Sequence, residues 1–209
     1  MAPNRCSVSL LRVQLVWQPS LLGASPPRCD PTFRLAERHD LGSGAWLEVV
    51  PHWVEGADTL FESVLAAAPW GEHERHMYDR KVMEPRLTTR LWDDPPPLVD
   101  EMAGILSDRY GRALTSVSAN LYRDGRDSVA WHGDRVGRLR DDTVVALVSL
   151  GSARRFLLRP VEGGPSLRLR PLPGDLVVLG GTAQKTWQHC VPKTKQAGPR
   201  ISVMFREVY

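Results

Sequence analysis

The second half of the chain is a succession of short segments in which apolar and polar residues alternate or apolar residues run together. Residues 116–123 alternate, residues 143–150 form an apolar run, and residues 201–205 alternate near the end of the sequence. Three shorter segments lie between them, at residues 156–159, 167–170 and 175–179. Many short strands separated by turns are typical of a β-sandwich or barrel, so the pattern predicts one in this half.

The first half has helical spacing. Apolar residues recur at helical intervals from residue 60 to residue 68, and Pro69 ends this helix. Thr59 begins a capping-box pattern at its start. A second helix is predicted from Leu98 to Tyr110, with Gly111 as its stop. Helices followed by strands indicate an α+β protein.

The length of 209 residues and the hydrophobic content of 42% suit one domain with a packed core. Residues 1–45 are rich in Pro, Ser, Gly and Arg and are predicted to form an irregular arm. Residues 46–112 would hold the helices and a polar, basic stretch at 71–94, which is either a substrate lid or an ordinary long loop. Residues 113–209 would form the β core, in one folded unit with residues 46–112.

The net charge of +3 is unevenly placed along the chain. From Asn120 to the end there are 15 Lys/Arg against 8 Asp/Glu, a balance of +7. The preceding residues carry the remaining 12 Lys/Arg against 16 Asp/Glu, a balance of −4. This asymmetry fits a polyanionic partner near the second half, or an ordinary solvated surface of mixed charge.

The cysteine content and the hydropathy of the chain indicate in which compartment of the cell the protein is expected. Cys6, Cys29 and Cys190 are an odd and unpatterned set, which argues against a disulfide framework and for a reducing compartment. No apolar run approaches the roughly 18 residues that a membrane span needs. Residues 1–18 lack a clear signal-peptide pattern. The expected location is therefore the cytoplasm, without a membrane partner.

Five residues of the second half suggest iron and 2-oxoglutarate. His132, Asp134 and His189 supply two imidazoles and one carboxylate, the facial triad that holds ferrous iron and leaves positions open for dioxygen. Arg200 and Arg206 lie six positions apart on a predicted strand and so share a face. Since a guanidinium binds a carboxylate through two parallel hydrogen bonds, the pair suits a dicarboxylate. The pattern predicts an oxygenase that uses 2-oxoglutarate.

Four motifs in this order carry a family resemblance: Asn120-Leu121-Tyr122, His132-Gly133-Asp134, His189, and the run from Arg200 to Arg206. Together they resemble the AlkB family of Fe(II)- and 2-oxoglutarate-dependent nucleic-acid dealkylases, as found in bacterial AlkB-like proteins. Three further segments resemble core strands of that family, at Val148–Gly151, Arg155-Phe156 and Leu172–Leu176. The resemblance runs from about Pro85 to Tyr209, over half of the chain.

The resemblance implies a double-stranded β-helix, or jelly-roll, with N-terminal helices and a substrate-binding lid. It implies that His132, Asp134 and His189 are the catalytic Fe(II) ligands, with 2-oxoglutarate and O2 as co-substrates. Arg200 would bind the distal carboxylate of 2-oxoglutarate, and Arg206 would lie near the metal-side carboxylate and Asp134. The remaining residues implied to bind the co-substrate are Asn120, Tyr122 and Ser202, the last at a position where the family commonly has Asn.

The implied activity is oxidative removal of N-alkyl groups from DNA or RNA bases, such as N1-methyladenine and N3-methylcytosine, in single or double strands. The products would be formaldehyde, succinate and CO2, and the role would be repair of alkylation damage. No obligate protein partner is implied. Val136 departs from the family, which usually has an acidic residue there, so the identity of the base stays open. The candidate substrate contacts are Tyr78, Arg86, Trp92, Trp131, Arg135 and Val136.

The sequence leaves three further functions open. An oxygenase of the same fold could hydroxylate or demethylate a protein or a small molecule. A catalytically idle protein could bind nucleic acid without turnover, although the complete triad speaks against this. A zinc hydrolase could use the same three ligands. That interpretation leaves Arg200 and Arg206 without a role.

Overall fold

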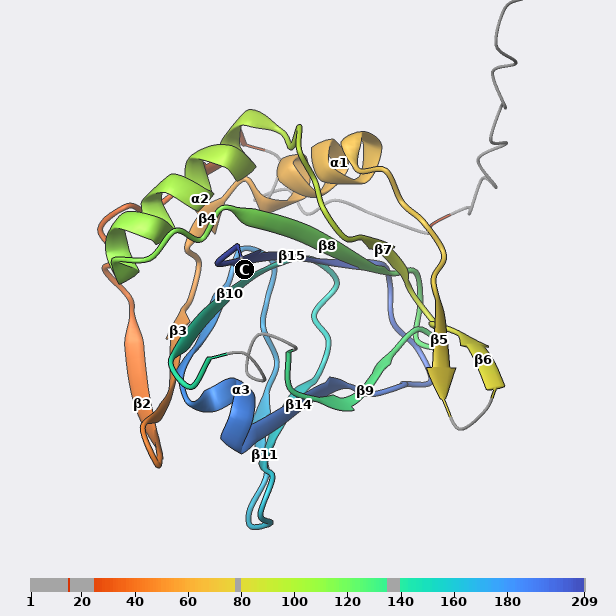
Figure 1. The fold of residues 1–209 in the computed structure, drawn as a ribbon. Helices are drawn as coiled ribbons and strands as arrows, with labels where there is room; N and C mark the ends of the chain where they lie inside the picture. Colours follow the sequence, from red (N-terminus) through yellow and green to blue (C-terminus); the bar gives the residue numbers. More distant parts are fainter. Residues whose placement is uncertain (1–14, 16–24, 78–79, 135–139, 209) are drawn as a thin grey trace, which may run out of the picture.

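The computed structural model describes residues 15, 25–77, 80–134 and 140–208. Two antiparallel β-sheets face each other in this part of the chain, with helices over the outer face of the larger sheet (Figure 1). The larger sheet has seven strands, in the order β2 (Glu37–Gly42), β3 (Ala45–Val50), β13 (Leu176–Gly181), β10 (Thr143–Gly151), β15 (Arg200–Arg206), β8 (Ser116–Tyr122) and β7 (Leu87–Thr89). The smaller sheet has four, in the order β12 (Leu167–Leu169), β11 (Phe156–Pro160), β14 (Trp187–Val191) and β9 (Val129–His132).

Two helices cover the larger sheet, α1 (Ala57–Ala67) and α2 (Pro97–Tyr110) (Figure 1). The capping-box prediction for α1 is wrong, because the helix begins before Thr59 and its N-cap is Gly56, with no side-chain cap. The end of α2 is as predicted, since Gly111 adopts the left-handed conformation that glycine permits, at φ 62°. A third, one-turn helix, α3 (Ala183–Thr186), joins β13 to β14.

The two faces of the larger sheet bury different side chains. In β8 and β15, alternate apolar residues, such as Leu121 and Phe205, pack against the core beneath α1 and α2. The intervening residues, such as Tyr122 and Met204, face the space between the two sheets, where a second core lies. This alternation is the period of two that a strand imposes, and it confirms the predicted shared face of Arg200 and Arg206.

The segments before β8 are more regular than predicted. The prediction of an irregular arm is wrong for β2, which forms an edge of the larger sheet, and for β1 (Arg28–Cys29), which pairs with β4 (Val54–Glu55). The polar stretch at 71–94 is not one long loop, because it holds the hairpin of β5 (Glu74–Met77) and β6 (Arg80–Met83) and the sheet strand β7. The division into arm, extension and core stays a prediction. In the described part of the chain, every helix is too short or too polar to cross a membrane.

Candidate metal centre and co-substrate pocket

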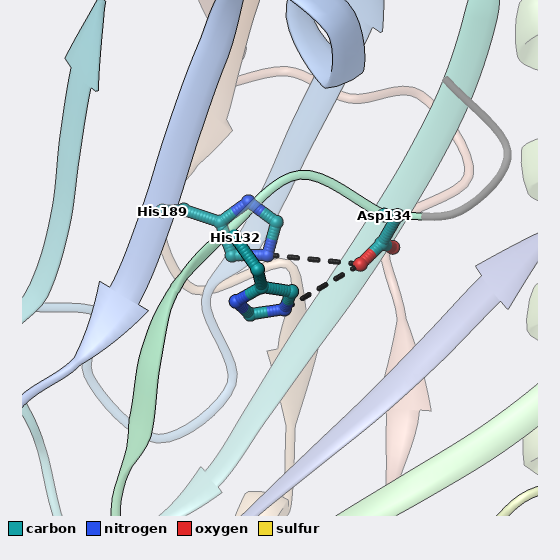
Figure 2. A group of neighbouring side chains, drawn as sticks. All are labelled: His132, Asp134 and His189. Atoms are coloured by element: carbon teal, nitrogen blue, oxygen red, sulfur yellow. Dashed lines mark ion pairs between the residues drawn. The ribbon is translucent and has the colours of Figure 1, made fainter. Parts of the chain in front are cut away.

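The three predicted metal ligands lie on, or directly after, neighbouring strands of the smaller sheet. His132 ends β9 and pairs directly with His189 of β14. Between this pair and the pair Val129–Val191, two residues of β9 lie opposite one residue of β14, which is a β-bulge. Asp134 follows two positions after His132, and the three side chains converge (Figure 2).

The donor atoms of this triad lie close enough to share one ion. Asp134 Oδ1 is 3.7 Å from His132 Nε2 and 3.8 Å from His189 Nε2, and the three ligand atoms lie within 4.8 Å of one another. His132 Nδ1 is 2.8 Å from the carbonyl oxygen of Ala130. Because a carbonyl only accepts, Nδ1 carries the proton and Nε2 keeps its lone pair for a metal. Two imidazole nitrogens and a carboxylate fit Fe(II).

Burial and charge set the protonation states of the triad. Burial lowers the pKa of His189 from 6.5 to about 3, and the nearby His132 adds to this shift. Burial acts to raise the pKa of Asp134, but the charges of Arg206 and of the two histidines outweigh it and hold that pKa well below its usual range. His189 is therefore neutral and Asp134 ionised at pH 7, the states in which they bind a metal.

Arg206, at one end of β15, holds the second oxygen of Asp134. Its Nε donates to Asp134 Oδ2 at 2.8 Å, and a terminal nitrogen donates to Ser118 Oγ at 2.7 Å. One oxygen of the carboxylate thus faces the histidines while a guanidinium fixes the other. The expectation that Arg206 lies beside Asp134 is confirmed.

The other end of β15 carries a buried cation. Arg200 is 2% exposed, a terminal nitrogen donates to Ser149 Oγ at 2.9 Å, and its Cζ lies 5.4 Å from the ring centre of Tyr122. Burial lowers the pKa of Arg200, and among the described residues none of these contacts is a carboxylate. Its Nε and the Oγ of Ser202 lack a hydrogen-bond partner among the described residues. Such a site fits a carboxylate brought by a ligand, as 2-oxoglutarate would bring it.

The other predicted co-substrate residues line the same strands. Tyr122 pairs with Arg200 across the sheet, and Asn120 pairs with Ser202. Asn120 Oδ1 accepts a hydrogen bond from Arg86 Nε at 3.1 Å. Arg86, predicted as part of the lid, therefore contacts a residue of the predicted co-substrate pocket and is half-buried there.

The predicted base contacts have different outcomes. Trp92 is 7% exposed and packs in the core beneath the helices, with its backbone N–H donating to the carbonyl of Val117. It has no free face for a base, and that prediction is wrong. Trp131 is half-buried, and the guanidinium of Arg159 lies 4.3 Å from its ring centre. Three further candidates lie outside the described residues: Tyr78, Arg135 and Val136.

Among the described residues, the contacts with the site that were not predicted include those of Ser118, Ser149 and Gln184. The two serines lie on β8 and β10, which flank β15. A polar residue within an apolar strand was the available signal for Ser149. Gln184 Oε1 accepts the backbone N–H of Asp134 at 2.8 Å. No local pattern marks this glutamine, because its partner lies 50 positions away in the sequence.

Comparison with protein families decides what kind of protein carries this site. The sequence model of the family described as the 2OG-Fe(II) oxygenase superfamily matches residues 61–206, which are most of the chain. The chain belongs to this superfamily. The predicted Fe(II), 2-oxoglutarate and O2 are thereby confirmed, as is the predicted class of Fe(II)/2-oxoglutarate-dependent dioxygenase.

Curated relatives of this oxygenase are AlkB homologues. Alpha-ketoglutarate-dependent dioxygenase alkB homolog 3 of Homo sapiens is 30% identical over 180 residues, which are 75% of this chain and 63% of that protein. DNA oxidative demethylase ALKBH2 of Arabidopsis thaliana is 27% identical over 214 residues, 81% of this chain and 68% of that protein. The resemblance to the AlkB family is confirmed, although the chain spans less than two thirds of its alkB homolog 3 relatives.

Solved structures agree on the fold. The structure of OsALKBH1 superposes with a TM-score of 0.57 at 16% identity, covering 82% of this chain and 100% of that chain. A prolyl hydroxylase from Trichoplax adhaerens superposes with a TM-score of 0.56 at 11% identity, covering 77% of this chain and 83% of that chain. At these identities the likeness concerns the fold alone, and the predicted jelly-roll core is confirmed.

Proposed function

We propose that this oxygenase removes N-alkyl groups from nucleic-acid bases, such as N1-methyladenine and N3-methylcytosine in DNA or RNA. The observation that carries the proposal is the identity to proteins named alkB homolog 3 and DNA oxidative demethylase, over most of this chain. Those names describe the relatives. The complete triad and the buried Arg200 support a working active site in this chain as well.

Fe(II), with 2-oxoglutarate and O2, supplies the oxidising chemistry when bound. The residues of the chain would position the metal and the co-substrate. Arg200 and Tyr122 would orient the distal carboxylate of 2-oxoglutarate, while Arg206 holds Asp134 toward the histidines. The ring of Phe156 packs beside that of His189, with the two ring centres 5.3 Å apart. The expected products are the unmodified base, formaldehyde, succinate and CO2.

The described surface supports a nucleic-acid substrate. Trp131 lies next to His132 on the edge strand β9 and stacks with the exposed Arg159. A basic concavity, whose lining residues include no Asp or Glu, contains Arg155 and Arg170. Exposed guanidinium groups suit phosphates, and aromatic rings suit unstacked bases. A target base in a duplex must leave the stack to reach the triad, at a cost of a few kcal/mol.

The test is a formaldehyde assay with Fe(II), ascorbate and 2-oxoglutarate. The substrates are oligonucleotides carrying N1-methyladenine or N3-methylcytosine, as single and double strands of DNA and RNA. We expect stoichiometric formaldehyde and succinate from at least one of them, and none with His132→Ala. Turnover of 2-oxoglutarate coupled to peptides or small molecules, but to no methylated oligonucleotide, would overturn the proposal in favour of a protein or small-molecule substrate.

An idle nucleic-acid binder and a zinc hydrolase would each release neither formaldehyde nor succinate in this assay, and further measurements tell them apart. The idle binder would bind the oligonucleotides without consuming 2-oxoglutarate. The zinc hydrolase would keep its activity without O2 and would be purified with zinc. The buried, carboxylate-free Arg200 speaks against a hydrolase, because it has no function there.

The cysteines support the location that we propose, which is the cytoplasm. Among the described residues, Cys29 and Cys190 form no disulfide, and Cys6 lies outside that part of the chain. Free thiols persist in a reducing compartment. Fractionation of cells that express the tagged protein would test this.

A further inference from the structure

Asp134 lies beyond the end of β9, so its placement depends on contacts from elsewhere in the molecule. Its carboxylate is held by Arg206, and its backbone N–H donates to the side-chain oxygen of Gln184 at 2.8 Å. The second contact fixes the main chain from which the ligand projects. A side chain that holds the backbone of a metal ligand determines where the carboxylate can point.

Gln184 makes a second contact with the same turn, through its own backbone. A Cβ added to Gly133 would lie 2.3 Å from the carbonyl oxygen of Gln184, closer than any real Cβ contact. Only glycine therefore allows residue 133 to approach α3 so closely. The turn from His132 to Asp134 rests on Gln184 through both its side chain and its main chain.

The helix that carries Gln184 is itself anchored. Thr182, its N-cap residue, donates from Oγ1 to the carbonyl of Ser43 at 2.8 Å. The carbonyl of Thr186 accepts the backbone N–H of Val161 at 2.8 Å. Five positions after Gln184, the same segment contributes His189. One anchored segment thus supplies one metal ligand directly and supports the turn that supplies the other two.

The carboxamide of Gln184 is not part of a larger polar network in the described structure. Gln184 is 5% exposed, and its Nε2 is buried without a hydrogen-bond partner among the described residues. Because a buried N–H without a partner is unfavourable, an apolar side chain of the same shape should pack there without a penalty. What such a side chain would lose is the acceptor for the Asp134 N–H.

We propose that Gln184 is a positioning residue of the iron site, which sets metal affinity by holding the backbone of Asp134. This inference rests on the triad as the metal site and not on nucleic acid as the substrate. Mn(II) binding and dealkylation can therefore succeed or fail separately.

The experiment is titration of the metal-free protein with Mn(II), followed by calorimetry and electron paramagnetic resonance, well below the melting temperature of each variant. Gln184→Met keeps the shape and removes the acceptor, and we expect the Kd for Mn(II) to rise about 10- to 100-fold. Gln184→Glu retains an acceptor and should restore most of the affinity. The matched control is Gln188→Met on the same segment, whose side-chain oxygen accepts from the outward-facing Arg159 and whose Kd should not change.

Wild-type affinity in Gln184→Met, or an equal loss in Gln188→Met, would overturn the inference.

A second pair of variants tests the main-chain contact. Gly133→Ala should weaken Mn(II) binding, whereas Gly104→Ala in α2, where a Cβ meets nothing within 4 Å, should not. If Gln184→Met fails to fold, hydrogen exchange of the Asp134 amide in the wild-type metal-free protein decides. Slow exchange supports the hydrogen bond to Gln184, and exchange at the rate of an unprotected amide overturns it.

Discussion

The two ends of β15 present the same residue type in opposite electrostatic situations. Arg206 is partly exposed and paired with Asp134 at 2.8 Å. Arg200 is almost fully buried, and its described contacts are a serine hydroxyl and a tyrosine. Both project into the space between the two sheets, because six positions along a strand preserve the face.

The difference shows which arginine has an acidic partner within the described protein and which does not. The protein completes the Arg206 pair, and in doing so it aims one oxygen of Asp134 at the histidines. It leaves Arg200 as a buried cation, which is unfavourable until an anion arrives. We therefore propose that one end of the strand orients a metal ligand and that the other end binds a carboxylate of the co-substrate.

Asp134→Ala should have the largest effect on the difference between the two arginines. It removes a metal ligand and at the same time leaves Arg206 without its carboxylate, as Arg200 already is. We expect 2-oxoglutarate turnover to fall to the background of metal-free protein, measured as succinate release. Activity near the wild-type level would show that the metal lies elsewhere.

Arg200→Met tests the carboxylate end. The variant removes a buried charge without removing any described ion pair, so the melting temperature of the ligand-free protein should stay the same or rise. The stabilisation of wild-type protein by 2-oxoglutarate should disappear in calorimetry, since ligand binding stabilises only the state that binds it.

Arg200→Lys is the finer version of the same test. It keeps the charge but loses the two parallel hydrogen bonds, and charged hydrogen bonds are worth about 1.5–3 kcal/mol. We expect the KM for 2-oxoglutarate to rise roughly 10- to 100-fold, with a smaller change in kcat at saturation. An unchanged KM would place the distal carboxylate at another site.

Arg206→Met tests the paired end. Without this guanidinium the pKa of Asp134 should rise toward its ordinary value, so protons should compete with metal more effectively. We expect Mn(II) affinity to fall about tenfold near pH 7, in line with the loss of other groups that orient a ligand, and to fall further as the pH decreases. A pH-independent loss would show that Arg206 acts through packing and not through charge.

Acid should destabilise the metal-free protein through the triad end and not through Arg200. The pKa of His189 is lowered in the folded protein, so the unfolded chain binds this proton more readily. Its contribution to stability is complete above about pH 6.5 and is lost as the pH falls toward about 3. Thermal unfolding in EDTA should show this fall, and His189→Gln should make it shallower. An identical pH dependence in the variant would contradict the assignment.

Ser202→Ala should have the smallest effect. The Oγ of Ser202 is buried and lacks a partner in the described structure, so its removal should leave the melting temperature nearly unchanged. If this hydroxyl donates to the co-substrate beside Arg200, the KM for 2-oxoglutarate should rise only a few-fold, as for one neutral hydrogen bond. A large loss of stability would mean that Ser202 has a structural role.

The sequence by itself determined the kind of chemistry at the site and the strand face on which the two arginines lie. A strand repeats every two residues, so the spacing alone placed Arg200 and Arg206 on one side. The residue types of the triad predicted iron, with zinc as the alternative. The strands at 143–150 and 201–205 and the stop at Gly111 were equally local features, and the structure has them within one or two residues.

The tertiary structure alone decided which residues meet. Pairing of β9 with β14 places His189 beside His132, and α3 brings Gln184 to the backbone of Asp134. The fold also buried Trp92, which the sequence had suggested as a substrate contact. Such outcomes depend on strand register and on the packing of distant segments. No local periodicity encodes them, because they arise only when the whole chain has buried its apolar faces together.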